Sequence, residues 1–153
     1  MTIRCIGNTG RFLRSLSKDN NSDNESDYKL DKYGSFARTE FNEYKLGQIY
    51  LVMGILFCEN HQRYLIDDYG RVEAAPAELF EVISGRIVDP DWYYIKLARD
   101  DSFYPLIEAV ISYKELCTDE SAVKKLLMDD EDALTIYFKH KSDLERIIEE
   151  GVV

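Results

Sequence analysis

The stretch QIYLVMGILFCENHQRYLIDD, residues 48–68, decides the fold expected for this chain. The segments Gln48 to Cys58 and Arg63 to Asp67 are rich in β-branched and aromatic residues, which favour strands. Glu59-Asn60-His61 between them has the polar composition of a tight turn. The stretch therefore predicts a β-hairpin near the middle of the chain.

More short strands are expected downstream of this hairpin. Asp67-Asp68-Tyr69-Gly70 predicts a turn, because glycine supplies backbone freedom and aspartate caps exposed amides. Pro76 to Phe80 predicts one helical turn followed by a strand that ends at Ser84-Gly85. Asp89-Pro90-Asp91 is a further turn, and Trp92 to Leu97 a further strand. About five short strands in succession predict a small antiparallel barrel or a strongly bent sheet, assigned to residues 39–99.

The N-terminal part divides into two segments. Residues 1–17 predict a first strand, with Ile3 and Cys5 alternating, and then a turn over Gly7-Asn8-Thr9-Gly10. Residues 18–38 are rich in Asn, Asp and Ser and poor in apolar residues, so they predict a mobile polar loop.

The C-terminal part, residues 103–153, predicts an acidic and mostly helical layer. Apolar residues recur at helical spacing after Pro105, at Leu106, Val110, Tyr113 and Leu116. Thr118 to Ser121 predicts the cap of a second helix over Ala122 to Met128. Ala133 to Phe138 fits either strand or helix. Ser142 predicts the cap of a last helix that ends at Gly151.

Length and cysteine usage complete the expected class. A chain of 153 residues fits a single α+β domain that needs no disulfide or metal. Cys5, Cys58 and Cys117 are widely spaced among apolar residues, which indicates reduced thiols and a cytoplasmic location. The N-terminus lacks the apolar core of a signal peptide, and no apolar run reaches the ~20 residues of a membrane span.

The charge of the chain restricts its partners. It carries 19 Lys and Arg against 29 Asp and Glu, a formal net charge of −10. Residues 89–153 hold 8 basic and 16 acidic side chains, so they carry −8 of that charge. Because nucleic-acid binding depends on basic side chains that displace counterions, we expect neither direct nucleic-acid binding nor a membrane surface as partner. The same charge would attract a basic protein.

The adjacent carboxylates Asp67 and Asp68 are the first candidates for chemistry. Neighbouring residues on a strand point to opposite faces, so the pair does not converge on one atom for acid–base work. A metal site would need further ligands from elsewhere in the chain. We therefore expect no catalytic residue, metal ligand or cofactor at this turn, and we interpret it as a solvated turn with a possible contact role.

A second acidic group is the run Asp129-Asp130-Glu131-Asp132, which the dipole of a following helix would favour. Together with Asp89, Asp91, Asp100 and Asp101 it would form a negative face if these segments pack together. Carboxylates on such a face can occupy the positions of phosphate groups in the site of a nucleic-acid-binding partner.

Aromatic residues accompany these carboxylates in the sequence. Strand alternation directs about half of the residues from Trp92 to Leu97 inward, and those that point outward would be interface anchors, because Trp and Tyr dominate binding hot spots. The predicted partner-binding residues are Asp67, Asp68, Tyr69, Asp89, Asp91, Tyr93, Asp100, Asp101 and Tyr104.

The segments IRCIGNTG, TEF, LGQIYLVMGI, RYLIDDYG and PAELFEVISGR, with the strand that contains Trp92, resemble a group of small bacterial proteins with an SH3-like barrel. The resemblance covers about residues 2–97 and implies an SH3-like fold for the predicted β core. In size and acidity the chain is also similar to immunity proteins of bacterial toxin systems, including contact-dependent growth inhibition.

That resemblance implies a protein that binds and neutralises a cognate toxin domain, often a basic nuclease such as an RNase, by occluding its active site. We expect a cytoplasmic monomer that forms a 1:1 heterocomplex and has no enzymatic activity. Two other interpretations stay open. The first is a regulatory or scaffolding module that binds a peptide or a host protein. The second is a small enzyme whose site assembles from Cys58, His61 and the acidic turn.

Overall fold

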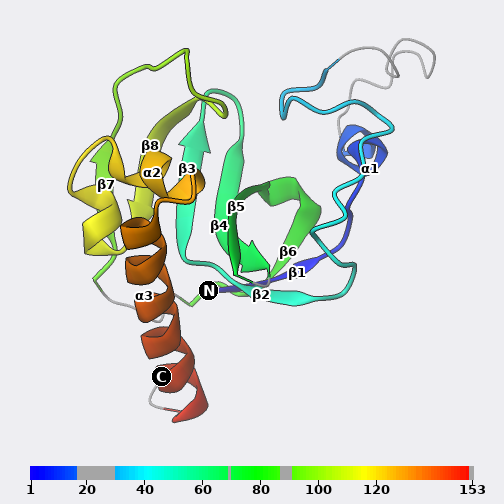
Figure 1. Cartoon of the computed structure of the whole chain (residues 1–153). Coiled ribbons are helices and arrows are strands. Elements are labelled where there is room, and N and C mark those ends of the chain that lie inside the picture. The colour runs from blue at the N-terminus through cyan, green and yellow to red at the C-terminus, as the bar shows by residue number, and fades with distance from the viewer. Residues whose placement is uncertain (17–29, 69, 87–90, 152–153) are drawn as a thin grey trace.

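The computed structural model describes residues 1–16, 30–68, 70–86 and 91–151. Over these residues the chain forms an α+β fold of two antiparallel sheets and a C-terminal helix (Figure 1). The elements are β1 (Thr2–Cys5), α1 (Gly10–Ser15), β2 (Ile49–Leu51), β3 (Gly54–Cys58), β4 (Gln62–Asp68), β5 (Arg71–Pro76), the 3-10 turn η2 (Ala77–Leu79), β6 (Phe80–Ser84), β7 (Tyr93–Lys96), β8 (Ile107–Ser112), the 3-10 turn η3 (Lys114–Cys117), α2 (Ala122–Leu127) and α3 (Glu131–Glu149).

The predicted hairpin is confirmed as β3 and β4, which pair antiparallel with Gly54 opposite Leu65. The single strand predicted from Gln48 to Cys58 is wrong, because it divides into β2 and β3, which belong to different sheets. The division falls at Val52 and Met53. The amide of Val52 donates to the carbonyl of Met1 at 3.1 Å, whereas that of Met53 donates to Leu65 at 2.8 Å. The chain therefore passes from one sheet to the other at these two residues.

The helix predicted from Leu106 to Leu116 is also wrong. Residues Ile107–Ser112 form β8, which lies between β3 and β7 in a sheet of order β5-β4-β3-β8-β7. Val110 is fully buried and Ala109 nearly so, and a strand buried on both faces shows an apolar run that imitates helical spacing. One strand of the larger sheet thus comes from the segment predicted to be a helical layer.

The larger sheet packs on both of its faces, which gives the molecule two cores. On one face Leu56, Leu65 and Val110 join a cluster with Leu126 and Tyr137 of the helices. The other face packs against the second sheet, of order β2-β1-β6, through a cluster that includes Ile3, Tyr50, Tyr64, Ile66 and Phe80. The alternation of side chains along β4 supplies residues to both cores.

Of the elements expected near the C-terminus, one is confirmed and the other two form a single helix. The helix predicted over Ala122 to Met128 is confirmed as α2. The segment from Ala133 to Phe138 is helical, and α3 continues through Ser142 without interruption, so the separate helix predicted after Ser142 is wrong. The N-cap of α3 is Asp130, whose side chain accepts from the amide of Ala133 at 3.0 Å.

The predicted first strand is confirmed as β1, and a short helix that we did not predict follows it. Thr9 caps this helix, α1, by accepting from the amide of Phe12 at 3.0 Å. Gly10 is required at its start, because a Cβ atom there would lie 1.8 Å from the carbonyl oxygen of Phe36. Tyr33 and Ala37 are buried, so the described part of the predicted loop packs on the protein. Residues 18–29 lie outside the described residues.

The strands predicted after Pro76 and after Asp91 are confirmed as β6, which follows η2, and as β7. Over the described residues each sheet ends in two edge strands, so a closed barrel, one of the two expected forms of the β core, is not confirmed. Cys5, Cys58 and Cys117 are free thiols, as predicted. Among the helices of the described ranges, none combines the length and apolar character needed to cross a membrane.

Candidate functional site

Asp67 is committed to a contact within the protein. Its side chain is only 7% exposed, and it accepts hydrogen bonds from Tyr137 Oη at 3.0 Å and from Lys141 Nζ at 2.8 Å. Burial, and then the nearby Asp67 carboxylate, raise the pKa of the Tyr137 phenol, so this hydroxyl stays a donor. The predicted contact residue Asp67 therefore joins the end of β4 to α3.

Asp68, the next residue along the strand, lies beside the same pocket as Asp67, although strand alternation predicts that neighbouring side chains point to opposite faces. The pocket lies beside α3, and the Oδ1 atom of Asp68 is shielded from solvent without a hydrogen-bond partner among the described residues. Tyr69, the next predicted contact residue, lies outside the described residues. The acidic turn thus holds one carboxylate that the fold uses and one that the fold leaves incompletely satisfied.

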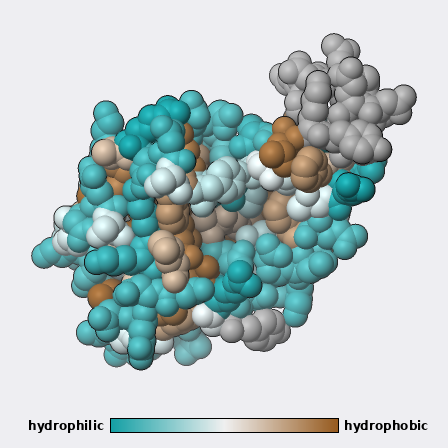
Figure 2. Space-filling view, turned by 45° about the horizontal axis from the view of Figure 1, so that its top comes forward, coloured by the Kyte–Doolittle hydropathy of each residue, from teal (hydrophilic) through white to brown (hydrophobic). Residues whose placement is uncertain are grey.

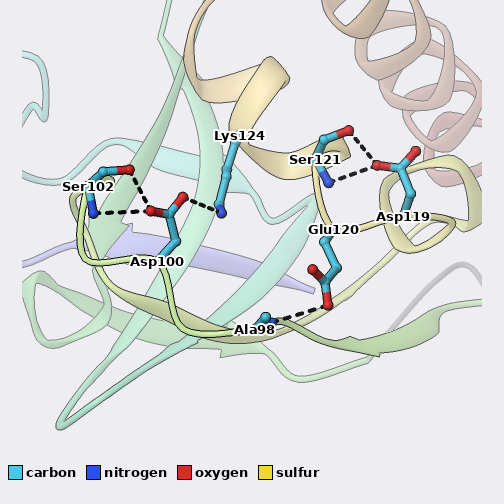
Figure 3. A network of polar contacts seen from close by, with 7 residues as sticks. All are labelled: Ala98, Asp100, Ser102, Asp119, Glu120, Ser121 and Lys124. Atoms are coloured by element: carbon cyan, nitrogen blue, oxygen red, sulfur yellow. Dashed lines mark hydrogen bonds and ion pairs between the residues drawn. The ribbon is translucent and has the colours of Figure 1, made fainter.

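Asp100 and Asp101 are paired with basic side chains of the same chain. Asp100 Oδ2 lies 2.7 Å from Lys124 Nζ, and its Oδ1 accepts from the amide of Ser102 at 3.1 Å (Figure 3). The bond from Lys124, followed by those from Ser102, lowers the pKa of Asp100 to about 2. Asp101 pairs with Arg99 at 2.9 Å.

The other carboxylates in Figure 3 also stabilise loops. Asp119 accepts from the amide of Ser121 at 2.7 Å, just before α2, and Glu120 accepts from the amide of Ala98 at 3.3 Å. The bond between Ala98 and Glu120 connects the segment after β7 to the segment just before α2. The acidic residues of this region therefore form stabilising contacts within the protein itself.

Asp91, Asp100 and Asp101, the described aspartates of the predicted set around β7, lie at the two ends of this strand. Asp91 is exposed just before β7, whereas Asp100 and Asp101 follow this strand, and an extended strand separates its ends by ~3.3 Å per residue. Asp89 lies outside the described residues. The run from Asp129 to Asp132 is exposed, as expected, at the start of α3, where Asp130 acts as the helix cap.

Tyr93 and Tyr94 are aromatic residues that the fold leaves exposed to a partner. They are 44% and 62% exposed, and they lie on β7, an edge strand of the larger sheet. Tyr93 is one of the predicted partner-binding residues, and Tyr94 belongs to the same predicted strand, Trp92 to Leu97. On the face shown in Figure 2, polar residues cover most of the surface and apolar residues show between them.

Tyr104 is 64% exposed, but its hydroxyl is already bonded within the protein. It donates to the carbonyl of Tyr33 and accepts from Arg63 Nη2 at 3.4 Å, and the Arg63 guanidinium lies 5.7 Å from the centre of its ring. Tyr104 thus packs one face on a buried arginine and presents the rest to solvent.

Arg63 is a central residue that the sequence reasoning missed. It is 7% exposed and donates to His61 Nε2 at 2.8 Å, to the carbonyl of Ala74 at 2.9 Å and to that of Tyr33 at 3.0 Å. One feature of the sequence indicates that Arg63 is buried: it lies two residues before Leu65, and strand alternation places both side chains on the same face.

The enzyme interpretation required Cys58, His61 and the acidic turn to converge. Burial raises the pKa of Cys58 to about 11, so its reactive thiolate is scarce at neutral pH. Burial, and then the neighbouring Arg63, lower the pKa of His61 to about 4. Asp67 lies six residues after His61, which places it on the order of 20 Å away along β4. The groups do not assemble into an activated nucleophile.

Comparison with known proteins finds no matching family model, no matching curated protein and no matching solved structure. Within the described ranges, no group of three His, Cys, Asp or Glu residues is placed to hold a metal ion.

Proposed function

We propose that this chain is a non-enzymatic binding protein that neutralises a basic toxin domain, in the manner of an immunity protein. In this proposal it acts in the cytoplasm of the cell that makes it, and it occludes the active site of a nuclease such as an RNase in a 1:1 complex. The single observation that carries the proposal is the aromatic edge strand β7, with its exposed Tyr93 and Tyr94.

The edge position supports a role in binding. An edge strand presents backbone amides and carbonyls that can pair with a strand of another protein. Tyr93 and Tyr94 point to opposite faces of the sheet, so a partner that adds to this edge contacts one ring on each side. Tyrosine loses little conformational entropy for the area that it buries, which suits it to be an anchor.

Charge supports a basic partner. The net charge of −10 favours encounter with a positively charged protein, and such steering accelerates association by about 10- to 1,000-fold at low salt. Because Asp100 and Asp101 are paired with Lys124 and Arg99, we assign the steering to the charge of the whole chain and not to these two residues. Asp91 is exposed just before β7. Among the described carboxylates of the predicted set, it lies nearest in the sequence to Tyr93 and Tyr94.

The test is coexpression with the product of the neighbouring gene. The expected result is that this product arrests growth alone, that this chain restores growth, and that the two copurify in a 1:1 complex. Tyr94→Ala should weaken the complex and the rescue, whereas Leu46→Ala, a control at a position 63% exposed, should change neither. The absence of both toxicity and a complex would contradict the proposal and would favour the regulatory or scaffolding module.

A further inference from the structure

A pocket of about 230 Å³ lies where β2, the end of β4 and α3 meet. Asp67 and Asp68 line it from the sheet, and Lys141 and Glu145 line it from the helix. Ile49 and Leu51 of β2 line it as well. The pocket thus combines a charged side with apolar residues.

The charges in this pocket do not balance. It contains three carboxylates and one ammonium group. Lys141 Nζ lies 2.8 Å from Asp67 Oδ2 and 3.7 Å from Glu145 Oε1, so this single cation serves two of the carboxylates. Asp68 is left as the third carboxylate of the pocket. A bound cation would pair with this third carboxylate.

Asp68 supplies a second and independent reason to expect a ligand. Its Oδ1 atom is shielded from solvent and has no hydrogen-bond partner among the described residues. Buried polar atoms are nearly always hydrogen-bonded, and an unpartnered acceptor destabilises the fold. The terminal torsion of aspartate is broad, so a rotation of the carboxylate can bring this oxygen to a donor in the pocket.

The geometry favours an organic cation. Over the described residues no three His, Cys, Asp or Glu side chains are close enough together to coordinate a metal ion. A planar guanidinium has several N–H donors spread over its edges and can reach carboxylates that lie apart. Its alkyl chain would contact Ile49 and Leu51, as the stems of long basic side chains commonly do with apolar surface.

We propose that this pocket binds an alkylguanidinium group, with Asp68 and Glu145 accepting its hydrogen bonds. The inference does not depend on the proposed function, because the group can belong to an arginine side chain of a protein partner or to a free small molecule. Asp67 keeps its bonds to Tyr137 and Lys141 and closes the inner side of the site.

The probe is butylguanidinium, titrated into the full chain and followed by NMR. Saturable shifts at the pocket residues are expected, with millimolar affinity. Butylurea is the matched control probe, since it has nearly the same shape without the charge, and it should bind at least about tenfold more weakly. Equal binding of the two probes, or no saturable shift with either, would overturn the proposal.

Two variants locate the binding group. Asp68→Asn should weaken butylguanidinium binding at least about tenfold, and Glu145→Gln about threefold, because Glu145 also interacts with Lys141. Asp143→Asn, an exposed position on the same helix that pairs with Arg146, should leave affinity unchanged. Asp68→Asn should not lower the melting temperature, since it removes an unsatisfied carboxylate. Unchanged affinity in both pocket variants would contradict the assignment.

A capped Gly-Arg-Gly peptide distinguishes the two sources. Binding of the peptide at least as tightly as butylguanidinium assigns the site to an arginine of a protein partner. Binding of butylguanidinium together with exclusion of the peptide assigns it to a free small molecule. In both results the pocket recognises the guanidinium, and failure of both ligands to bind would refute the inference.

Discussion

Strand β4 buries an arginine near its start and an aspartate near its end, and it satisfies the two charges in different ways. Arg63 donates to neutral acceptors, namely His61 and two backbone carbonyls, whereas Asp67 meets the ammonium of Lys141. Both are on the face of β4 that carries Leu65, and four residues separate them by ~13 Å, so they cannot pair with each other.

The difference shows that neutral hydrogen-bonding groups, and not only an opposite charge, can stabilise a buried charge. Around Arg63 the partners come from a loop, a neighbouring strand and the segment before β8, so the guanidinium holds irregular segments on the sheet. Around Asp67 both partners come from α3, so the carboxylate fixes one helix. Four predictions test this contrast.

The largest effect is expected at Arg63. Arg63→Met keeps most of the side-chain volume but leaves the carbonyls of Tyr33 and Ala74 without their charged donor, which should lower the free energy of unfolding by about 2–4 kcal/mol. Urea denaturation measures the loss. Arg71→Met is the control, because that side chain is 77% exposed, and it should cost less than about 1 kcal/mol. Similar losses in the two variants would contradict a special role for Arg63.

The next effect is expected at the other end of the strand. Lys141→Met leaves the buried Asp67 with the Tyr137 hydroxyl alone and should cost about 1–3 kcal/mol. Adding Asp67→Asn should recover part of this loss, because it removes the unpaired charge. Lys139→Met, at an exposed position on the same helix, is the control. A double variant less stable than Lys141→Met would show that the ammonium is not what stabilises Asp67.

A smaller and pH-dependent effect is expected at His61. Burial and Arg63 lower its pKa to about 4, whereas in the unfolded chain its pKa stays at about 6.5. Between these values the unfolded chain binds a proton that the folded protein does not, so His61 makes stability fall as pH drops from about 6.5 to 4. His61→Gln should flatten the profile in this window. Identical slopes in the two proteins would rule out His61 as the cause.

Elements defined by local signals were predictable from the sequence. The β3–β4 hairpin, η2 with β6, β7 and α2 follow from turn residues, alternation or capping next to them in the chain. β8 was mistaken for a helix because both of its faces are covered, which removes the alternation that identifies a strand. A possible cap at Ser142 similarly divided α3, since sequence alone does not reveal that the helix continues through it.

The candidate site was predictable in composition but not in orientation. The sequence identifies Asp67, Asp100 and Tyr93 by residue type, yet it does not show which way each one faces. The partner of Asp67 is 74 residues away, and that of Asp100 is 24 residues away. Such contacts depend on the tertiary fold, so the sequence does not show that Asp67 and Asp100 form ion pairs within the chain.

The smallest effect is expected at the ion pair of Asp101 and Arg99, which provides an exposed counterpart to Asp67 and Lys141. The two side chains are 73% and 65% exposed, so water already solvates them and salt screens their attraction. A double-mutant cycle with Asp101→Asn and Arg99→Gln should give a coupling energy below about 0.5 kcal/mol, and the cycle at Asp67 and Lys141 a clearly larger one. Raising the salt concentration should reduce the first coupling further and change the second little, because Asp67 is shielded by the protein. Equal couplings in both cycles would mean that burial does not determine how strongly these carboxylates hold their partners.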